Sequence, residues 1–87
     1  MIKSWTDEAW EDFVYWTNNN KKILKRILQL LKDIDRNGYY GIGKPERSSG
    51  ELSKYWSRRI DYGNRIVYRI KDNVIKIVQC GSHYRDK

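Results

Sequence analysis

Residues 56–71 read WSRRIDYGNRIVYRIK, and their pattern predicts the central strands of a sheet. β-Branched and aromatic residues on both sides of a Tyr-Gly-Asn triplet are typical of two strands joined by a turn. A third run of apolar residues follows after a second turn. The segments expected from this pattern are strands over about 51–62, 65–71 and 74–81, with turns at 62–64 and 71–73.

The spacing of isoleucines and arginines predicts what each face of this sheet carries, because side chains alternate along a strand. An odd number of residues in the first connection places on one face Ile60, Ile66, Tyr68 and Ile70, and on the other Arg59, Arg65 and Arg69. An even number would mix both kinds on both faces. We therefore expect helices against the isoleucine face and an open cationic face.

The first half of the chain predicts a short strand and two helices. Residues 1–5 are typical of a strand, Thr6 of an N-cap, and the spacing of Trp5 and Trp10 of a hydrophobic staple. A second helix ends at Asn37-Gly38, and its predicted apolar face is Ile23, Leu24, Ile27, Leu28, Leu31 and Ile34. A long loop over 38–50 then carries Glu46, and such loops are often functional.

Composition limits the class of protein. At 87 residues the chain is expected to form one domain, 1–87. Its net charge of +7 favours a polyanionic partner, although a soluble basic surface would have the same charge. Cys80 is the only cysteine, which predicts a reducing compartment and a small buried thiol. No apolar run suits a signal peptide or a membrane span, so we expect a cytoplasmic protein that does not bind membranes.

The basic side chains of the second half are candidate phosphate ligands. Arg59 and Arg65 can each offer paired donors to phosphate oxygens and stabilise the charge that builds there during cleavage. The alternative is that either arginine pairs with Asp61 or another surface acid. Further candidates for binding RNA or phosphate are Lys44, Arg58 and Arg69.

Three other side chains complete a set for general acid–base cleavage of RNA. Glu46 is ionised at neutral pH and suits a general base, whereas His83 is the only imidazole and suits a general acid. Tyr84 can orient the phosphate or stack on a base. Taken singly, each is more often an ordinary surface or packing residue. One histidine and one cysteine, unclustered, make no zinc site, so neither a metal nor a cofactor is expected.

Four motifs stand in order along the chain. They are Gly43-Lys44-Pro45-Glu46, Leu52-Ser53 with Trp56-Ser57-Arg58-Arg59-Ile60, Arg65 with Val67-Tyr68, and His83-Tyr84. In these motifs the chain resembles the YoeB/Txe family of toxin ribonucleases, within the RelE-like group. The resemblance implies an α+β fold with two N-terminal helices on a twisted, mainly antiparallel sheet of four to five strands.

The resemblance also implies a function and partners. Members cleave messenger RNA in the ribosomal A site by attack of the ribose 2′-hydroxyl, and a paired antitoxin of the YefM/Axe kind silences them. It assigns Glu46 as general base, His83 as general acid, Arg59 and Arg65 as phosphate ligands, and Tyr84 as an orienting aromatic. It further implies that a homodimer can form.

Three other functions remain open from the residues alone. One is a ribonuclease that needs no ribosome. Another is a non-catalytic module that binds RNA or the ribosome and blocks translation by occupancy. The third is that the exposed face only holds a protein partner, because arginines and aromatics are typical of such surfaces too.

Overall fold

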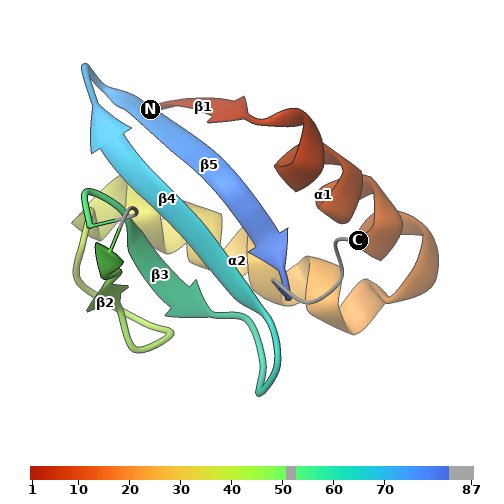
Figure 1. The fold of residues 1–87 in the computed structure, drawn as a ribbon. Coiled ribbons are helices and arrows are strands. Elements are labelled where there is room, and N and C mark those ends of the chain that lie inside the picture. Colours follow the sequence, from red (N-terminus) through yellow and green to blue (C-terminus); the bar gives the residue numbers. More distant parts are fainter. Residues whose placement is uncertain (51–52, 83–87) are drawn as a thin grey trace.

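Five strands form one sheet, and two helices pack against one of its faces (Figure 1). This computed structural model describes residues 1–50 and 53–82. The strand order is β1-β5-β4-β3-β2, in which β1 runs parallel to β5 and the other neighbours are antiparallel. The predicted α+β architecture with a mainly antiparallel sheet is confirmed. In chain order the elements are β1 (Ile2–Trp5), α1 (Asp7–Asn19), α2 (Lys21–Asn37), β2 (Glu46–Arg47), β3 (Trp56–Arg59), β4 (Arg65–Lys71) and β5 (Val74–Gly81).

Helix α1 begins as the sequence predicts. The Thr6 hydroxyl accepts the Ala9 N–H at 3.1 Å, which satisfies one of the amides that a helix start leaves unpaired. The Trp5 and Trp10 rings meet edge to face with centroids 5.8 Å apart, so the predicted staple is confirmed. Together these contacts fix the angle at which the chain passes from β1 into the helix.

Helix α1 is tied to β5 by side chains that reach the strand backbone. The Trp16 indole N–H donates to the Cys80 carbonyl at 2.8 Å, and the Asp12 carboxylate accepts the Cys80 N–H at 3.3 Å. Cys80 is fully buried beneath the helix, as predicted, and burial raises the pKa of its thiol to about 12.

Helix α2 covers the same face of the sheet. Asn20 caps its first turn by accepting the N–H groups of Lys22 and Ile23, and Gly38 ends it with a φ of +67°. Its buried residues are Ile23, Ile27, Leu30, Leu31 and Ile34. The predicted face was therefore wrong at Leu28, which is 50% exposed, and it omitted Leu30, which is fully buried. The apolar stripe is rotated toward Leu30, three residues after Ile27.

The predicted separation of isoleucines and arginines is confirmed. Five residues, 60–64, connect β3 to β4, so the connection is odd. Arg59 pairs with Arg65 across the two strands, and Arg58 pairs with Ile66. Cross-strand partners share a face, so Arg59, Arg65 and Arg69 lie on the side of the sheet away from the helices.

The boundaries of the first predicted strand were wrong. β3 covers only Trp56–Arg59, because the chain before it forms a turn in which the Ser53 N–H donates to the Gly50 carbonyl at 3.1 Å. The two-residue strand β2 was missed, since its sequence lies in the expected loop. Within the described residues, neither helix has the length and apolar character needed to cross a membrane.

Candidate active site

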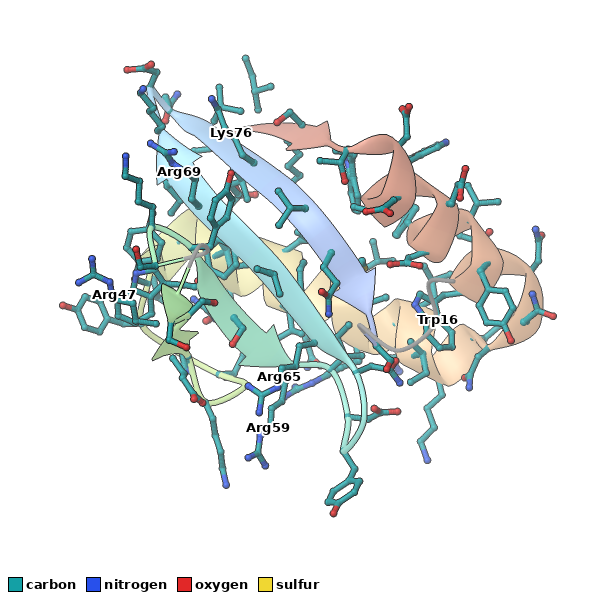
Figure 2. The ribbon with its side chains drawn as sticks, viewed as in Figure 1. Trp16, Arg47, Arg59, Arg65, Arg69 and Lys76 are labelled. Atoms are coloured by element: carbon teal, nitrogen blue, oxygen red, sulfur yellow. The ribbon has the colours of Figure 1, made fainter. Side chains whose placement is uncertain are left out.

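The open side of the sheet is a cationic surface, which we call the arginine face. It carries Arg59, Arg65, Arg69 and Lys76 (Figure 2). Figure 2 shows Arg59 and Arg65 together at one end of this surface, with Arg69 and Lys76 toward the other end. The sheet places them there because Arg59 pairs with Arg65 and Arg69 pairs with Lys76.

Glu46 joins the arginine face through β2. It pairs with Ser57 of β3, and Ser57 pairs in turn with Val67 of β4. The Arg65 guanidinium lies 3.6 Å from the Glu46 carboxylate and donates to the Ser57 hydroxyl at 3.3 Å. The Glu46 and Arg65 side chains are 63% and 38% exposed, so solvent and a ligand can both reach them. A carboxylate and a guanidinium are thus held together on an accessible surface.

Arg59 stands beside this pair as an unpaired cation. It is exposed, and among the described residues its guanidinium has no hydrogen-bond or ion-pair partner. Its backbone N–H donates to the Gly43 carbonyl at 2.7 Å, which fastens the loop that leads to Glu46. Lys44 lies on that loop, exposed and with a φ of +51°. Arg65 therefore contacts the Glu46 carboxylate, and Arg59 lies two residues along β3 from Ser57, the cross-strand partner of Glu46.

Arg58 was predicted to bind RNA, and the structure contradicts this. Its side chain lies on the helix side of the sheet and is fully buried. The guanidinium is occupied by an ion pair with Asp33, a hydrogen bond to the Tyr68 hydroxyl at 3.1 Å, and bonds to three backbone carbonyls, those of Gly38, Tyr40 and Ile42. No donor remains for a phosphate, because every nitrogen already has a partner.

The loop that carries Glu46 is folded around this buried guanidinium. The three carbonyls that Arg58 binds all belong to residues 38–42, which wrap it from one side. Gly43 follows with a φ of +83°, and a Cβ there would stand 2.8 Å from the Leu30 side chain. The chain is thereby turned back onto β3, where it forms β2. Arg58 is thus a positioning residue for Glu46.

The contacts around Arg58 shift the pKa values of two ionisable groups. The hydrogen bond from Arg58 is the main cause that lowers the pKa of Asp33 below its ordinary value of 3.8. Burial raises the pKa of Tyr68 above 10.0, so its hydroxyl stays protonated and donates to the Gly38 carbonyl at 2.9 Å. Both shifts keep the cluster in its hydrogen-bonded form at neutral pH.

Two of the predicted site residues, His83 and Tyr84, lie outside the described residues. β5 ends at Gly81, directly opposite Arg65. The alternative was that Arg59 or Arg65 pairs with Asp61 or another surface acid. Arg65 does pair with an exposed acid, Glu46, whereas the Asp61 carboxylate accepts three bonds within its own turn, from Gly63 and Asn64. In the part of the chain that is described, no group of three or more His, Cys, Asp or Glu side chains could hold a metal ion.

Sequence reasoning missed two residues that shape the site. Ser57 touches Arg65 and pairs with Glu46, and its alternation with Arg59 on one strand was a signal that could have revealed it. Asp33, the partner of Arg58, interrupts no pattern in α2. Its role depends on contacts between distant segments, and no local signal marks it.

The sequence and the fold together are similar to those of small bacterial toxins. The family of YoeB-like toxins of bacterial type II toxin–antitoxin systems matches residues 5–84. The YoeB toxin of Streptomyces coelicolor is 47% identical over 84 residues, which cover 97% of this chain and all of that protein.

Two solved structures from Staphylococcus aureus are similar as well. The YoeB–YefM complex contains a chain with a TM-score of 0.91 and 48% identity, and the YoeB dimer one with a TM-score of 0.90 and 47% identity. Each match covers 97% of this chain and 98% of the other. This chain belongs to the YoeB-like toxin family, and the family resemblance predicted from its motifs is confirmed.

Proposed function

We propose that this toxin is an endoribonuclease that cleaves messenger RNA in the ribosomal A site and so inhibits translation. The observation that carries the proposal is the contact of Glu46 with Arg65 on an open sheet face that also presents the exposed Arg59. A base beside two phosphate ligands suits cleavage of RNA at a phosphodiester. Among the described acids, Glu46 alone forms an ion pair with an arginine of this face.

The chemistry proceeds by transfer of two protons. Glu46 removes the proton of the ribose 2′-hydroxyl, and the 2′-oxygen attacks the adjacent phosphorus. Arg59 and Arg65 stabilise the negative charge that develops on the phosphoryl oxygens. The bond to the 5′-oxygen of the next nucleotide breaks, and His83 protonates that oxygen. The products are a 2′,3′-cyclic phosphate and a free 5′-hydroxyl.

The roles of His83 and Tyr84 rest on the sequence motif rather than on coordinates. His83 is proposed as the acid because it is the only histidine and can titrate near neutrality. Tyr84 is proposed to orient the phosphate. Arg65 has a second role in this scheme, because its charge keeps the Glu46 carboxylate in place until substrate binds.

The small size of the domain supports a dependence on the ribosome. The Glu46 and Arg65 side chains are exposed and lie on strands of two and seven residues. So small a domain has little surface with which to hold a flexible RNA strand in an attacking geometry. Binding to the ribosome would supply that order and lower the entropic cost of reaction.

The test is primer extension on a defined messenger RNA, incubated with the toxin with and without programmed ribosomes. We expect cuts in the A-site codon only with ribosomes, and cleavage rates lower by about 10²–10⁴-fold in Glu46→Ala and His83→Ala. Arg36→Ala removes an exposed cation at the end of α2 and serves as the control. Equal cutting of naked RNA would identify a free ribonuclease, and translation arrest without cleavage would identify a binding module.

We also propose that a YefM/Axe-like antitoxin binds and silences this chain and that the toxin forms a homodimer. The support is the S. aureus relatives, one solved with YefM and one as a dimer. Relief of toxicity on co-expression of an antitoxin gene adjacent to the toxin gene would test the first proposal. Light scattering at several protein concentrations would test the second, and a monomer throughout would refute it.

A further inference from the structure

A second cationic site lies on the arginine face, apart from Arg59 and Arg65. The Arg69 guanidinium lies over the Tyr55 ring, with its central carbon 5.9 Å from the ring centroid. Arg69 pairs across the strands with Lys76, and the Tyr55 carbonyl accepts the Ser48 N–H at 2.9 Å, so the row continues toward β2. We call Tyr55, Arg69 and Lys76 the outer row.

The outer row has two positive charges and, within residues 1–50 and 53–82, no counter-ion. In this part of the chain neither the Arg69 guanidinium nor the Lys76 ammonium forms an ion pair, whereas Arg58 and Arg65 both do. All three outer-row side chains are only partly buried. An aromatic ring beside two cations on an open sheet is a combination that suits single-stranded nucleic acid.

Sheet register places the outer row relative to the proposed cleavage site. The Arg59–Arg65 pair is followed two residues along the strands by Ser57 and Val67, the row to which Glu46 belongs. Two residues further lies the outer row. A two-residue step spans about 7 Å along a strand. Glu46 therefore stands between the two arginines that would hold the phosphate and the outer row.

This order sets the direction of the bound RNA, given the proposed function on which the inference rests. The 2′-hydroxyl that attacks belongs to the ribose on the 5′ side of the scissile phosphate. With the phosphate on Arg59 and Arg65 and the 2′-hydroxyl at Glu46, the 5′ side of the strand runs toward the outer row. The leaving 5′-oxygen then lies on the opposite side, away from Tyr55.

We propose that Tyr55 and Arg69 form a stacking platform for the base of the nucleotide that carries the attacking 2′-hydroxyl, and that Lys76 binds the phosphate on its 5′ side. A guanidinium on a tyrosine ring is flat and charged, so its second face can stack on any base. The platform would fix the ribose through its base and thereby align the 2′-hydroxyl with Glu46.

The first test measures RNA binding, which needs no catalysis. A fluorescein-labelled single-stranded RNA of mixed sequence is titrated at low salt with each variant, and anisotropy gives the dissociation constant. Loss of the ring in Tyr55→Leu is expected to weaken binding by about 5- to 100-fold, whereas Tyr55→Phe keeps the ring and the affinity. Tyr62→Leu is the matched control, because Tyr62 is fully exposed on the β3–β4 loop.

The substitution Arg69→Lys separates stacking from charge. It keeps the positive charge but removes the planar group, so binding should weaken if Arg69 acts as part of the platform. Unchanged binding in Arg69→Lys, or equal binding in Tyr55→Leu and Tyr62→Leu, would overturn the proposal. Thermal unfolding of each variant shows whether a loss of RNA binding comes from misfolding. Tyr55→Phe is a second control, because it keeps the ring and should keep both the fold and the affinity.

The second test assigns the nucleotide. Programmed ribosomes carry a messenger RNA with an abasic residue on the 5′ or the 3′ side of the cleaved bond. With the 5′ abasic residue the wild type should cleave about 5- to 100-fold more slowly than with the intact messenger RNA. Tyr55→Leu should cleave both messenger RNAs at the same rate, because it has already lost the stacking contact. Independent, additive losses would refute the placement. Absence of cleavage by the wild type would refute the proposed function. The RNA-binding test would then still decide whether Tyr55 and Arg69 form a stacking platform.

Discussion

The neighbouring residues Arg58 and Arg59 should respond in opposite ways to substitution by alanine. Arg58→Ala removes a fully buried guanidinium that binds three loop carbonyls, the Tyr68 hydroxyl and Asp33. Arg59→Ala removes an exposed guanidinium on the other face of the same strand. We expect the first substitution to destabilise the fold and the second to leave its stability unchanged.

The size of the effect follows from the groups left behind. Removing one partner of a buried ion pair costs about 3–5 kcal/mol, and each buried acceptor without a donor costs about 1–3 kcal/mol. The Asp33 side chain is 18% exposed, so water can replace part of what it loses, which favours the lower end of the range. We expect Arg58→Ala to lower the free energy of unfolding by about 3 kcal/mol, a large share of the roughly 5–15 kcal/mol of a typical domain.

Urea unfolding followed by tryptophan fluorescence measures this loss. In a domain of this length about 3 kcal/mol corresponds to a decrease in Tm of roughly 12–24 °C, whereas Arg59→Ala should stay within about 0.5 kcal/mol of the wild type. Equal stability of the two variants would refute the reasoning, because it would mean that the buried network contributes nothing. RNA cleavage should show the reverse order among the molecules that remain folded, with Arg59→Ala the more impaired.

Three further predictions concern other parts of the fold. Gly43→Ala should destabilise by about 1–3 kcal/mol, because its φ is +83° and a Cβ would meet the Leu30 side chain, whereas Gly63→Ala, which meets nothing, should be neutral in the same thermal scan. The pKa of Asp33 is lowered on folding, so the stability that its charge contributes is present above its ordinary value of 3.8 and is lost as pH falls toward the folded value. Asp33→Asn should therefore flatten the decline in stability as pH falls below 3.8, and an unchanged slope would contradict this. The raised pKa of the buried Cys80 thiol, about 12, predicts that iodoacetamide labels it slowly in the folded protein and quickly in urea; rapid native labelling followed by mass spectrometry would count against the described burial.

Alternation along the strands was enough to predict the arginine face. Residues one apart on a strand point to opposite sides, so the isoleucines and arginines could be separated once the connection was taken as odd. The N-cap of α1 was also local, since the Thr6 hydroxyl accepts the N–H of Ala9, three residues further along the chain. These features depend on neighbours in sequence, which is why sequence reasoning finds them.

The role of Arg58 could not be predicted from its neighbours. An arginine side chain is expected on the surface unless the core provides hydrogen-bond acceptors for its guanidinium. Four of its acceptors come from α2 and from the loop after it, at least 16 residues away in the chain, and the fifth is the Tyr68 hydroxyl on β4. The same limit applies to Glu46, whose contact with Arg65 exists because two residues of an apparent loop pair with β3.

The place of β5 in the sheet has a consequence for how the protein is made. β5 joins β1, the first strand of the chain, to β4, yet it is the last strand that a ribosome would synthesise. While residues 74–81 are still inside the exit tunnel, β1 has no neighbour in the sheet and α1 has no strand to pack along. Contacts between the two ends of a chain form only when both are available. Residues 74–81 must therefore leave the exit tunnel before β1 and α1 can take their places against β5.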